Sequence, residues 1–197
     1  TQTRTPSLER TVNIPDRDEA MVLLREYTKN ENLIKHALSV EAAMRYYAKL
    51  NGEDEELWGV IGLIHDFDYE KYPTLDDHPF KGAEILRERG YDESLVKAVL
   101  SHASHTNVSR DTELEKTLFA VDELCGMVTA VTLVRPSKKI ADVTVKSVKK
   151  KLKDKGFARA VNREEIIEGA ELIGVDLGTH IGNVIAAMQG ISDDLGL

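Results

Sequence analysis

The sequence contains one cysteine among its 197 residues. A single thiol cannot form an internal disulfide, so the composition gives no sign of an oxidising compartment. The sequence also lacks any stretch near the roughly 18 uninterrupted apolar residues of a membrane span. Residues 1–18 lack the apolar run of a targeting segment. We therefore expect a soluble cytoplasmic protein with no membrane partner.

Patterns typical of strands are missing as well, because no window alternates apolar and polar residues with a period of two. We find no internal repeat and no low-complexity tract. With 42% hydrophobic residues, a chain of 197 residues can bury one proper core, and two domains would be crowded. The sequence therefore predicts a single domain of the all-α class.

Apolar residues recur three or four positions apart along most of the chain, which is the spacing of one helix face. The predicted helices are 16–29, 33–50, 53–64, 78–90, 92–103, 111–134, 143–153, 162–173 and 176–191. We interpret 1–15 as an N-terminal arm and 16–135 as the helical core. Residues 136–197 are predicted to form a basic segment and C-terminal helices that pack on this core within the same domain.

The chain is poor in positive charge, with a formal net charge of −8, which argues against general binding of polyanions. The exception is the segment from Arg135 to Arg163, which has eleven Lys or Arg and two acids. Its net charge is +9, against −17 for the remainder. Phe157 is its one aromatic residue, so interleaved aromatics for base stacking are missing and we regard nucleic acid as an unlikely partner.

Histidine and aspartate interrupt the apolar pattern at the positions that face inward. The apolar run from Leu57 to Ile64 ends on the adjacent pair His65 and Asp66, which can offer one nitrogen and one carboxylate oxygen to the same metal ion. His36 falls three residues after Leu33, on the buried side of its helix. A lone histidine there is more often a core residue than a ligand. Whether His36 is a ligand therefore depends on matching residues in other elements.

Three further residues supply matching partners from other elements. Asp122 lies four residues after Leu118, and an ionised carboxylate on that inner face is costly unless a cation or several donors meet it. His102 also faces inward, and His78 opens a helix directly before a proline. Imidazole and carboxylate together suit a divalent transition metal such as Fe, Mn, Zn, Co or Ni.

The order of these residues resembles the HD-domain metal-dependent phosphohydrolase superfamily, in its HDIG-type branch. The residues that carry the resemblance are His36, His65, Asp66, His78, His102 and Asp122, and the segment beginning His78-Pro79-Phe80-Lys81-Gly82 is similar to that branch's His-Pro-x-x-Gly helix. The resemblance covers roughly residues 33–134 and implies an HD-domain-like helical bundle. It also implies that His36, His65, Asp66 and Asp122 hold one metal ion, and that Asp66 can bridge to a second held by His78 and His102.

The chain departs from that branch at three points. It reads His-Asp-Phe-Asp where the branch has His-Asp-Ile-Gly, and Ser101-His102-Ala103-Ser104-His105 where cyclic-dinucleotide phosphodiesterases carry a His-His pair. It also lacks their Gly-Tyr-Pro signature. We therefore leave the count at one or two ions and do not expect a cyclic dinucleotide as substrate.

A metal held by these ligands activates water for attack on phosphorus and neutralises phosphate oxygens. We assign Asp66 and Asp68 to the catalytic centre. Asp68 would be a supporting group or a general acid, and a loop residue that caps a turn is an equal alternative for it. Arg135, Lys138 and Lys139 follow the helix of Asp122, and we expect them to cover the metal pocket and bind a substrate phosphate. The lysines of 149–155 are expected to form a solvated helix face.

Three other polar residues are assigned no role in the site. Glu123 is expected to point away from Asp122 into solvent, and His105 to be exposed. His180 is expected at the surface or at a helix cap.

The sequence predicts a metal-dependent phosphohydrolase, either a phosphomonoesterase or a phosphodiesterase. Its substrate would be a small phosphate ester, which includes nucleotides. Two alternatives remain open, an HD-fold di-iron oxygenase and a non-catalytic metal-binding sensor or scaffold. A homodimer is a further expectation.

Overall fold

The computed structural model describes residues 12–197. Most of the predicted arm 1–15 therefore lies outside the described residues, and 12–15 have no regular secondary structure. The described part of the chain contains helices and no strand, which confirms the all-α prediction. The helices are α1 (Arg17–Tyr27), α2 (Glu31–Asn51), α3 (Glu55–Ile64), α4 (Phe80–Glu88), α5 (Glu93–Ser101), α6 (Glu113–Leu133), α7 (Val145–Lys153), α8 (Arg163–Leu172), α9 (Leu177–Gln189) and α10 (Ser192–Leu195), with short 3-10 turns at Ser104–Thr106 and Ile140–Asp142.

Polar side chains set where the helices begin. Asn30 accepts the backbone N–H groups of Asn32 and Leu33 at the start of α2. Thr112 and Glu115 form a reciprocal capping box at the start of α6. Each such cap satisfies backbone donors that the first turn leaves unpaired and contributes about 1 kcal/mol. Helix starts were therefore predictable to within a few residues, whereas the two 3-10 turns and α10 are too short to show a period.

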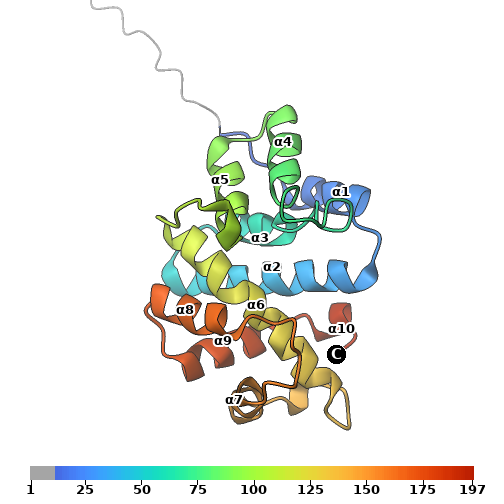
Figure 1. The fold of residues 1–197 in the computed structure, drawn as a ribbon, viewed down its shortest axis with the longest axis vertical. Coiled ribbons are helices and arrows are strands. Elements are labelled where there is room, and N and C mark those ends of the chain that lie inside the picture. The colour runs from blue at the N-terminus through green and yellow to red at the C-terminus, as the bar shows by residue number, and fades with distance from the viewer. Residues whose placement is uncertain (1–11) are drawn as a thin grey trace, which may run out of the picture.

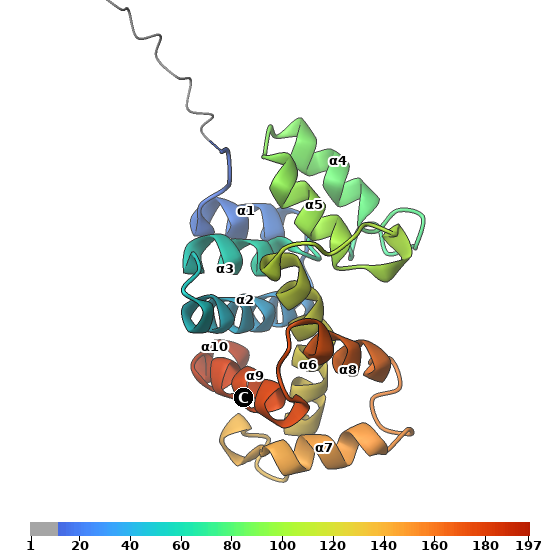
Figure 2. The same cartoon turned by 90° about the vertical axis from the view of Figure 1, so that its left-hand side faces the viewer.

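Helix α2 runs through the middle of the molecule (Figure 1). Helices α1 and α3 stack on one side of it and α9 and α10 on the other, while α6 crosses it (Figure 2). The hydrophobic core lies between these helices, where Val40, Leu63, Val128 and Val184 are completely buried. Helices α4 and α5 pair beyond α3, and α7 and α8 pack against α6.

Two glycines allow neighbouring helices to approach closely. A Cβ atom at Gly62 of α3 would lie 3.0 Å from the carbonyl oxygen of Val40 in α2. A Cβ atom at Gly169 of α8 would lie 2.5 Å from Cα of Ala120 in α6, a distance that real Cβ atoms essentially never show. The first contact places the end of α3 beside α2, and the second places α8 directly on α6.

The prediction that His180 lies at the surface is wrong. Its side chain in α9 is completely buried, with Nδ1 2.5 Å from the hydroxyl of Tyr47 and Nε2 2.8 Å from the carbonyl oxygen of Ala120. It therefore ties α9 to both α2 and α6. None of the helices between residues 12 and 197 combines the length and the apolarity that a membrane span requires.

Candidate metal centre

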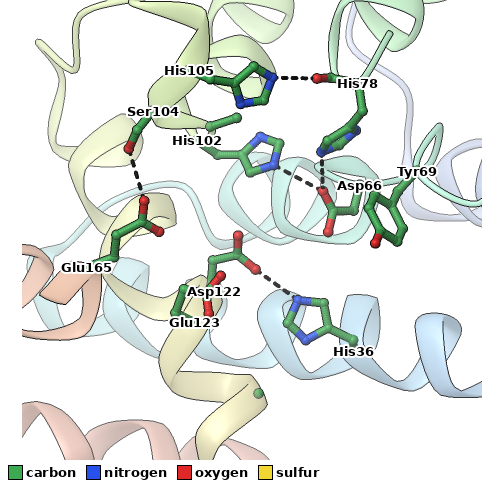
Figure 3. A pocket seen from close by; sticks show the side chains of 12 residues that line it. His36, Asp66, Tyr69, His78, His102, Ser104, His105, Asp122, Glu123 and Glu165 are labelled. Atoms are coloured by element: carbon green, nitrogen blue, oxygen red, sulfur yellow. Dashed lines mark hydrogen bonds and ion pairs between the residues drawn. The ribbon is translucent and has the colours of Figure 1, made fainter. Parts of the chain in front are cut away.

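Six histidine and aspartate side chains from five parts of the chain converge near the end of α3. Figure 3 shows all of them except His65. They form two groups with ligand atoms within 4.8 Å of one another, and Asp66 belongs to both groups. The first group is His36, His65, Asp66 and Asp122, and the second is Asp66, His78 and His102. These are the residues, and the division into two groups, that the resemblance implied.

The apolar end of α3 explains why the His65–Asp66 pair lies inside the protein. Leu63, Ile64 and Phe67 on either side of the pair are completely buried, and so is His65. Burial of this apolar segment stabilises the fold and carries the adjacent imidazole and carboxylate with it.

The first group is built around one oxygen of Asp122. Oδ1 of Asp122 lies 2.8 Å from Nε2 of His36 and 3.1 Å from Nε2 of His65. Nε2 of His65 is also 3.5 Å from Oδ2 of Asp66. Ligands about 2.1 Å from one metal ion lie about 3 Å apart when they are neighbours at right angles, so these separations suit a shared ion.

The second group is built around Oδ1 of Asp66, whose other oxygen faces the first group. Oδ1 of Asp66 lies 3.1 Å from Nε2 of His78 and 3.0 Å from Nε2 of His102. The two oxygens of Asp66 thus face different groups of histidines. Asp66 has the position of a bridging carboxylate.

Hydrogen bonds on the far side of three rings orient them for metal binding. Nδ1 of His65 faces the carbonyl oxygen of Gly62 at 2.6 Å, and Nδ1 of His102 faces that of Val99. Nδ1 of His78 lies 2.7 Å from Oδ1 of Asp68. A ring that donates its Nδ1–H to an acceptor keeps the lone pair of Nε2 for a metal ion. The donor set therefore fits a divalent transition metal.

The electrostatics of the groups favour a cation. Burial opposes a charge on His65, but the carboxylates of Asp66 and Asp122 outweigh it and raise its pKa to about 9. Burial likewise opposes a charge on His78, but hydrogen bonds to Asp66 and Asp68 raise its pKa to about 10. Positive charge is therefore stabilised at these nitrogens, either as a proton or as a metal ion in its place.

A cavity of about 490 Å³ opens over both groups. Its walls include Tyr69, Ser104, His105, Glu123 and Glu165 besides five of the six ligands, and none of its lining residues is Lys or Arg. The prediction that Glu123 is solvated and points away from the site is wrong. Its carboxylate accepts the backbone N–H of Asn162 at 3.0 Å, and burial, reinforced by Asp122, raises its pKa to about 7.

His105 is exposed and belongs to neither ligand group, although it lines the cavity. Its Nε2 lies 2.7 Å from the carbonyl oxygen of His78. Asp68, expected near the chemistry, is completely buried behind His78 and does not line the cavity. Its other oxygen accepts the N–H of Gly82 at 2.9 Å. Asp68 is placed to position His78 and does not reach the cavity, so we assign it no contact with a substrate there.

The expectation that Arg135, Lys138 and Lys139 cover the metal pocket is wrong as well. None of the three lines the cavity. Helix α6 continues to Leu133, eleven residues beyond Asp122, which is about 16 Å along a helix. The basic residues therefore begin beyond the C-terminal end of α6, where the guanidinium of Arg135 donates to the carbonyl oxygen of Asp142 at 2.8 Å.

Comparison with known proteins now adds to this geometry. Residues 33–127 match the family model of the HD domain. This segment of the chain is an HD domain, which agrees with the resemblance to the HD-domain superfamily. The matched part of the chain includes all six of the converging ligands, whereas Glu165 and the helices α7 to α10 follow it.

Three curated relatives resemble the HD-domain protein over less than half of its length. A tRNA (cytidine(56)-2'-O)-methyltransferase of Picrophilus torridus is 29% identical and one of Thermoplasma volcanium is 33% identical, each over 45% of this chain and 26% of the relative. An uncharacterized protein of Methanocaldococcus jannaschii is 33% identical over 43% of this chain and 52% of the relative. The chain thus matches about a quarter to a half of their length. No solved structure matches the chain significantly.

Proposed function

We propose that this HD-domain protein is a metal-dependent phosphohydrolase that acts on a small phosphate ester, nucleotides included. The observation that carries the proposal is the position of Asp66 between two groups of ligands at the floor of one cavity. HD domains typically belong to metal-dependent hydrolases, which agrees with this site.

The residues of the chain divide the work of such a site. Asp66 and Asp122 supply anionic oxygens and four histidines supply nitrogens. Hydrogen bonds from Nδ1 orient three of these rings, those of His65, His78 and His102. A divalent metal bound there lowers the pKa of a coordinated water and withdraws charge from phosphate oxygens. The cavity of about 490 Å³ has room for a small ester.

Methyl transfer is not our proposal, although two relatives are named as methyltransferases. The match covers only 26% of each of them, so the named activity belongs to a protein that is largely different from this chain. The described cavity offers metal ligands, which suit hydrolysis. An HD-fold di-iron oxygenase uses similar ligands, and a metal-binding sensor or scaffold would have no turnover, so the experiment must separate these three.

The test is metal analysis of protein purified without chelator, combined with turnover of phosphomonoesters and phosphodiesters in air and under anaerobic conditions. We expect bound transition metal and phosphate release that does not need oxygen. Asp66→Ala should lose both metal and turnover, whereas Asp76→Ala, an exposed aspartate in the same loop, should keep both. Turnover that requires oxygen would show an oxygenase. Bound metal without any turnover would show a sensor or scaffold.

A further inference from the structure

The cavity has an acidic wall that the metal ligands do not explain. Four of its lining residues are carboxylates and none is Lys or Arg. Asp66 and Asp122 belong to the ligand groups, but Glu123 and Glu165 belong to neither group. These last two residues form what we call the acidic wall.

The acidic wall is contributed by two helices that pack closely together. Glu123 follows Asp122 in α6, and Glu165 lies in the first turn of α8 (Figure 3). Glu123 accepts the backbone N–H of Asn162, the N-cap of α8, so it helps to hold that helix beside the cavity. Gly169 then seats α8 against Ala120 of α6. Glu165 is thus presented to the cavity by a helix outside the segment that matches the HD family model.

Neither carboxylate of the wall has a cationic partner within ion-pair distance among the described residues. One oxygen of Glu165 accepts the hydroxyl of Ser104 at 3.1 Å, and its other oxygen accepts no hydrogen bond in the described part of the chain. Arg110 donates to the same hydroxyl but is held by the carbonyl oxygen of Ser101, with its guanidinium over the ring of Phe119. Glu165 therefore keeps a free acceptor that faces the cavity.

The charges within the cavity limit which substrate fits. A phosphate group is repelled by uncompensated carboxylates and is attracted where a bound metal compensates Asp66 and Asp122. The phosphate of a substrate therefore belongs at the ligand groups. The organic part then extends toward the acidic wall, where a cation or a strong hydrogen-bond donor is favoured and a second anion is disfavoured.

We propose that the substrate is a phosphate ester that carries an amino or other cationic group, and that Glu165 is the residue that selects it. This inference rests on the proposed phosphohydrolase function. The phosphate would lie at the ligand groups and the cationic group at the free oxygen of Glu165. The C-terminal helices would then supply the specificity of a site that the HD segment builds.

The experiment compares matched substrates that differ in one group. Metal-loaded protein is assayed with ω-aminoalkyl phosphates and with ω-hydroxyalkyl phosphates of the same chain lengths. We expect kcat/KM to be about tenfold or more higher for the amino member of at least one pair, because Glu165 is half-buried and solvent and salt screen a partly buried charge pair less than an exposed one. Glu165→Gln should remove this preference through a higher KM for the amino substrate, while kcat and the metal content stay within about twofold.

Two controls make the outcomes decisive. Glu164→Gln changes the exposed neighbour of Glu165, which does not line the cavity, and should keep the preference. Equal hydrolysis of both members of every pair would overturn the inference and leave the phosphohydrolase standing. If no ester is hydrolysed, the proposed function fails. In that case the binding of the same pairs, measured by calorimetry with wild type and with Glu165→Gln, tests whether the acidic wall prefers the amino member independently of any turnover.

Discussion

Asp68 contacts the candidate metal centre through a single ring, because its Oδ1 lies 2.7 Å from Nδ1 of His78. The carboxylate is completely buried and is held in turn by the N–H of Gly82. A carboxylate in this position fixes the direction of the imidazole and makes its other nitrogen a stronger metal ligand. The relationship explains why the chain has an aspartate two residues after Asp66.

Replacing Asp68 should therefore weaken one of the two ligand groups. The two carboxylate oxygens of Asp68 now accept from His78 and from Gly82. In Asp68→Asn one of these oxygens becomes an NH₂ group, which cannot accept a hydrogen bond. We expect the affinity for metal at the group of His78 and His102 to fall about 10- to 100-fold, while the group of His36 keeps its affinity. Metal titration against a competing chelator measures the affinity of each of the two ligand groups.

Asp76→Asn in the same loop is the matched control for Asp68, because Asp76 is exposed. A variant at Asp68 that binds metal in both steps like wild type would show that the contact with His78 is only structural.

Glycine at position 169 should be required for stability. An added Cβ would meet Cα of Ala120 at 2.5 Å, so α8 would have to move away from α6. We expect Gly169→Ala to lower the free energy of unfolding by about 1–3 kcal/mol, as overpacking does. Urea unfolding measures this change. Gly156→Ala, at an exposed glycine with ordinary space around it, should stay within about 0.5 kcal/mol of wild type.

His180 should make the stability of the protein depend on pH. Burial lowers its pKa in the folded protein, whereas the unfolded chain takes up this proton near pH 6.5. Between the two pKa values the unfolded state binds more protons, so the stability contributed by a neutral His180 is present above pH 6.5 and is lost as the pH falls below it.

The variant His180→Gln isolates this effect from the other histidines. Chemical unfolding of both proteins at several pH values between 5 and 8 gives two stability curves. We expect the wild-type curve to fall more steeply below pH 6.5, by up to about 1.4 kcal/mol per pH unit. Parallel curves would mean that the pKa of His180 is the same in the folded and the unfolded protein.

The basic residues after α6 should not bind the substrate phosphate of this cavity. Lys138 and Lys139 do not line it and follow a helix that extends about 16 Å beyond Asp122. We expect the double change of Lys138 and Lys139 to Ala to alter KM for a phosphate ester by less than about twofold at physiological ionic strength, where distant charges are screened. Steady-state kinetics at two salt concentrations test this, and a tenfold rise in KM would restore these lysines to the site.

Local patterns in the sequence determined the helices and the inward positions of the ligands. His36 and Asp122 occupy the apolar faces of α2 and α6, and the period of a helix makes such positions readable without knowledge of the neighbours. The buried apolar end of α3 likewise indicated that His65 lies inside. The family resemblance then grouped these residues, and the structure brings the same residues together.

Only the tertiary structure decided which residues surround the ligands. Glu165 reaches the cavity because Gly169 lets α8 lie against α6, and His180 is buried because α9 packs on α2 and α6. The length and direction of α6 take Lys138 away from the pocket. Helical period reports which side of a helix is buried but not which helix covers it. Contacts between elements distant in the sequence are set by packing, and packing depends on the whole fold.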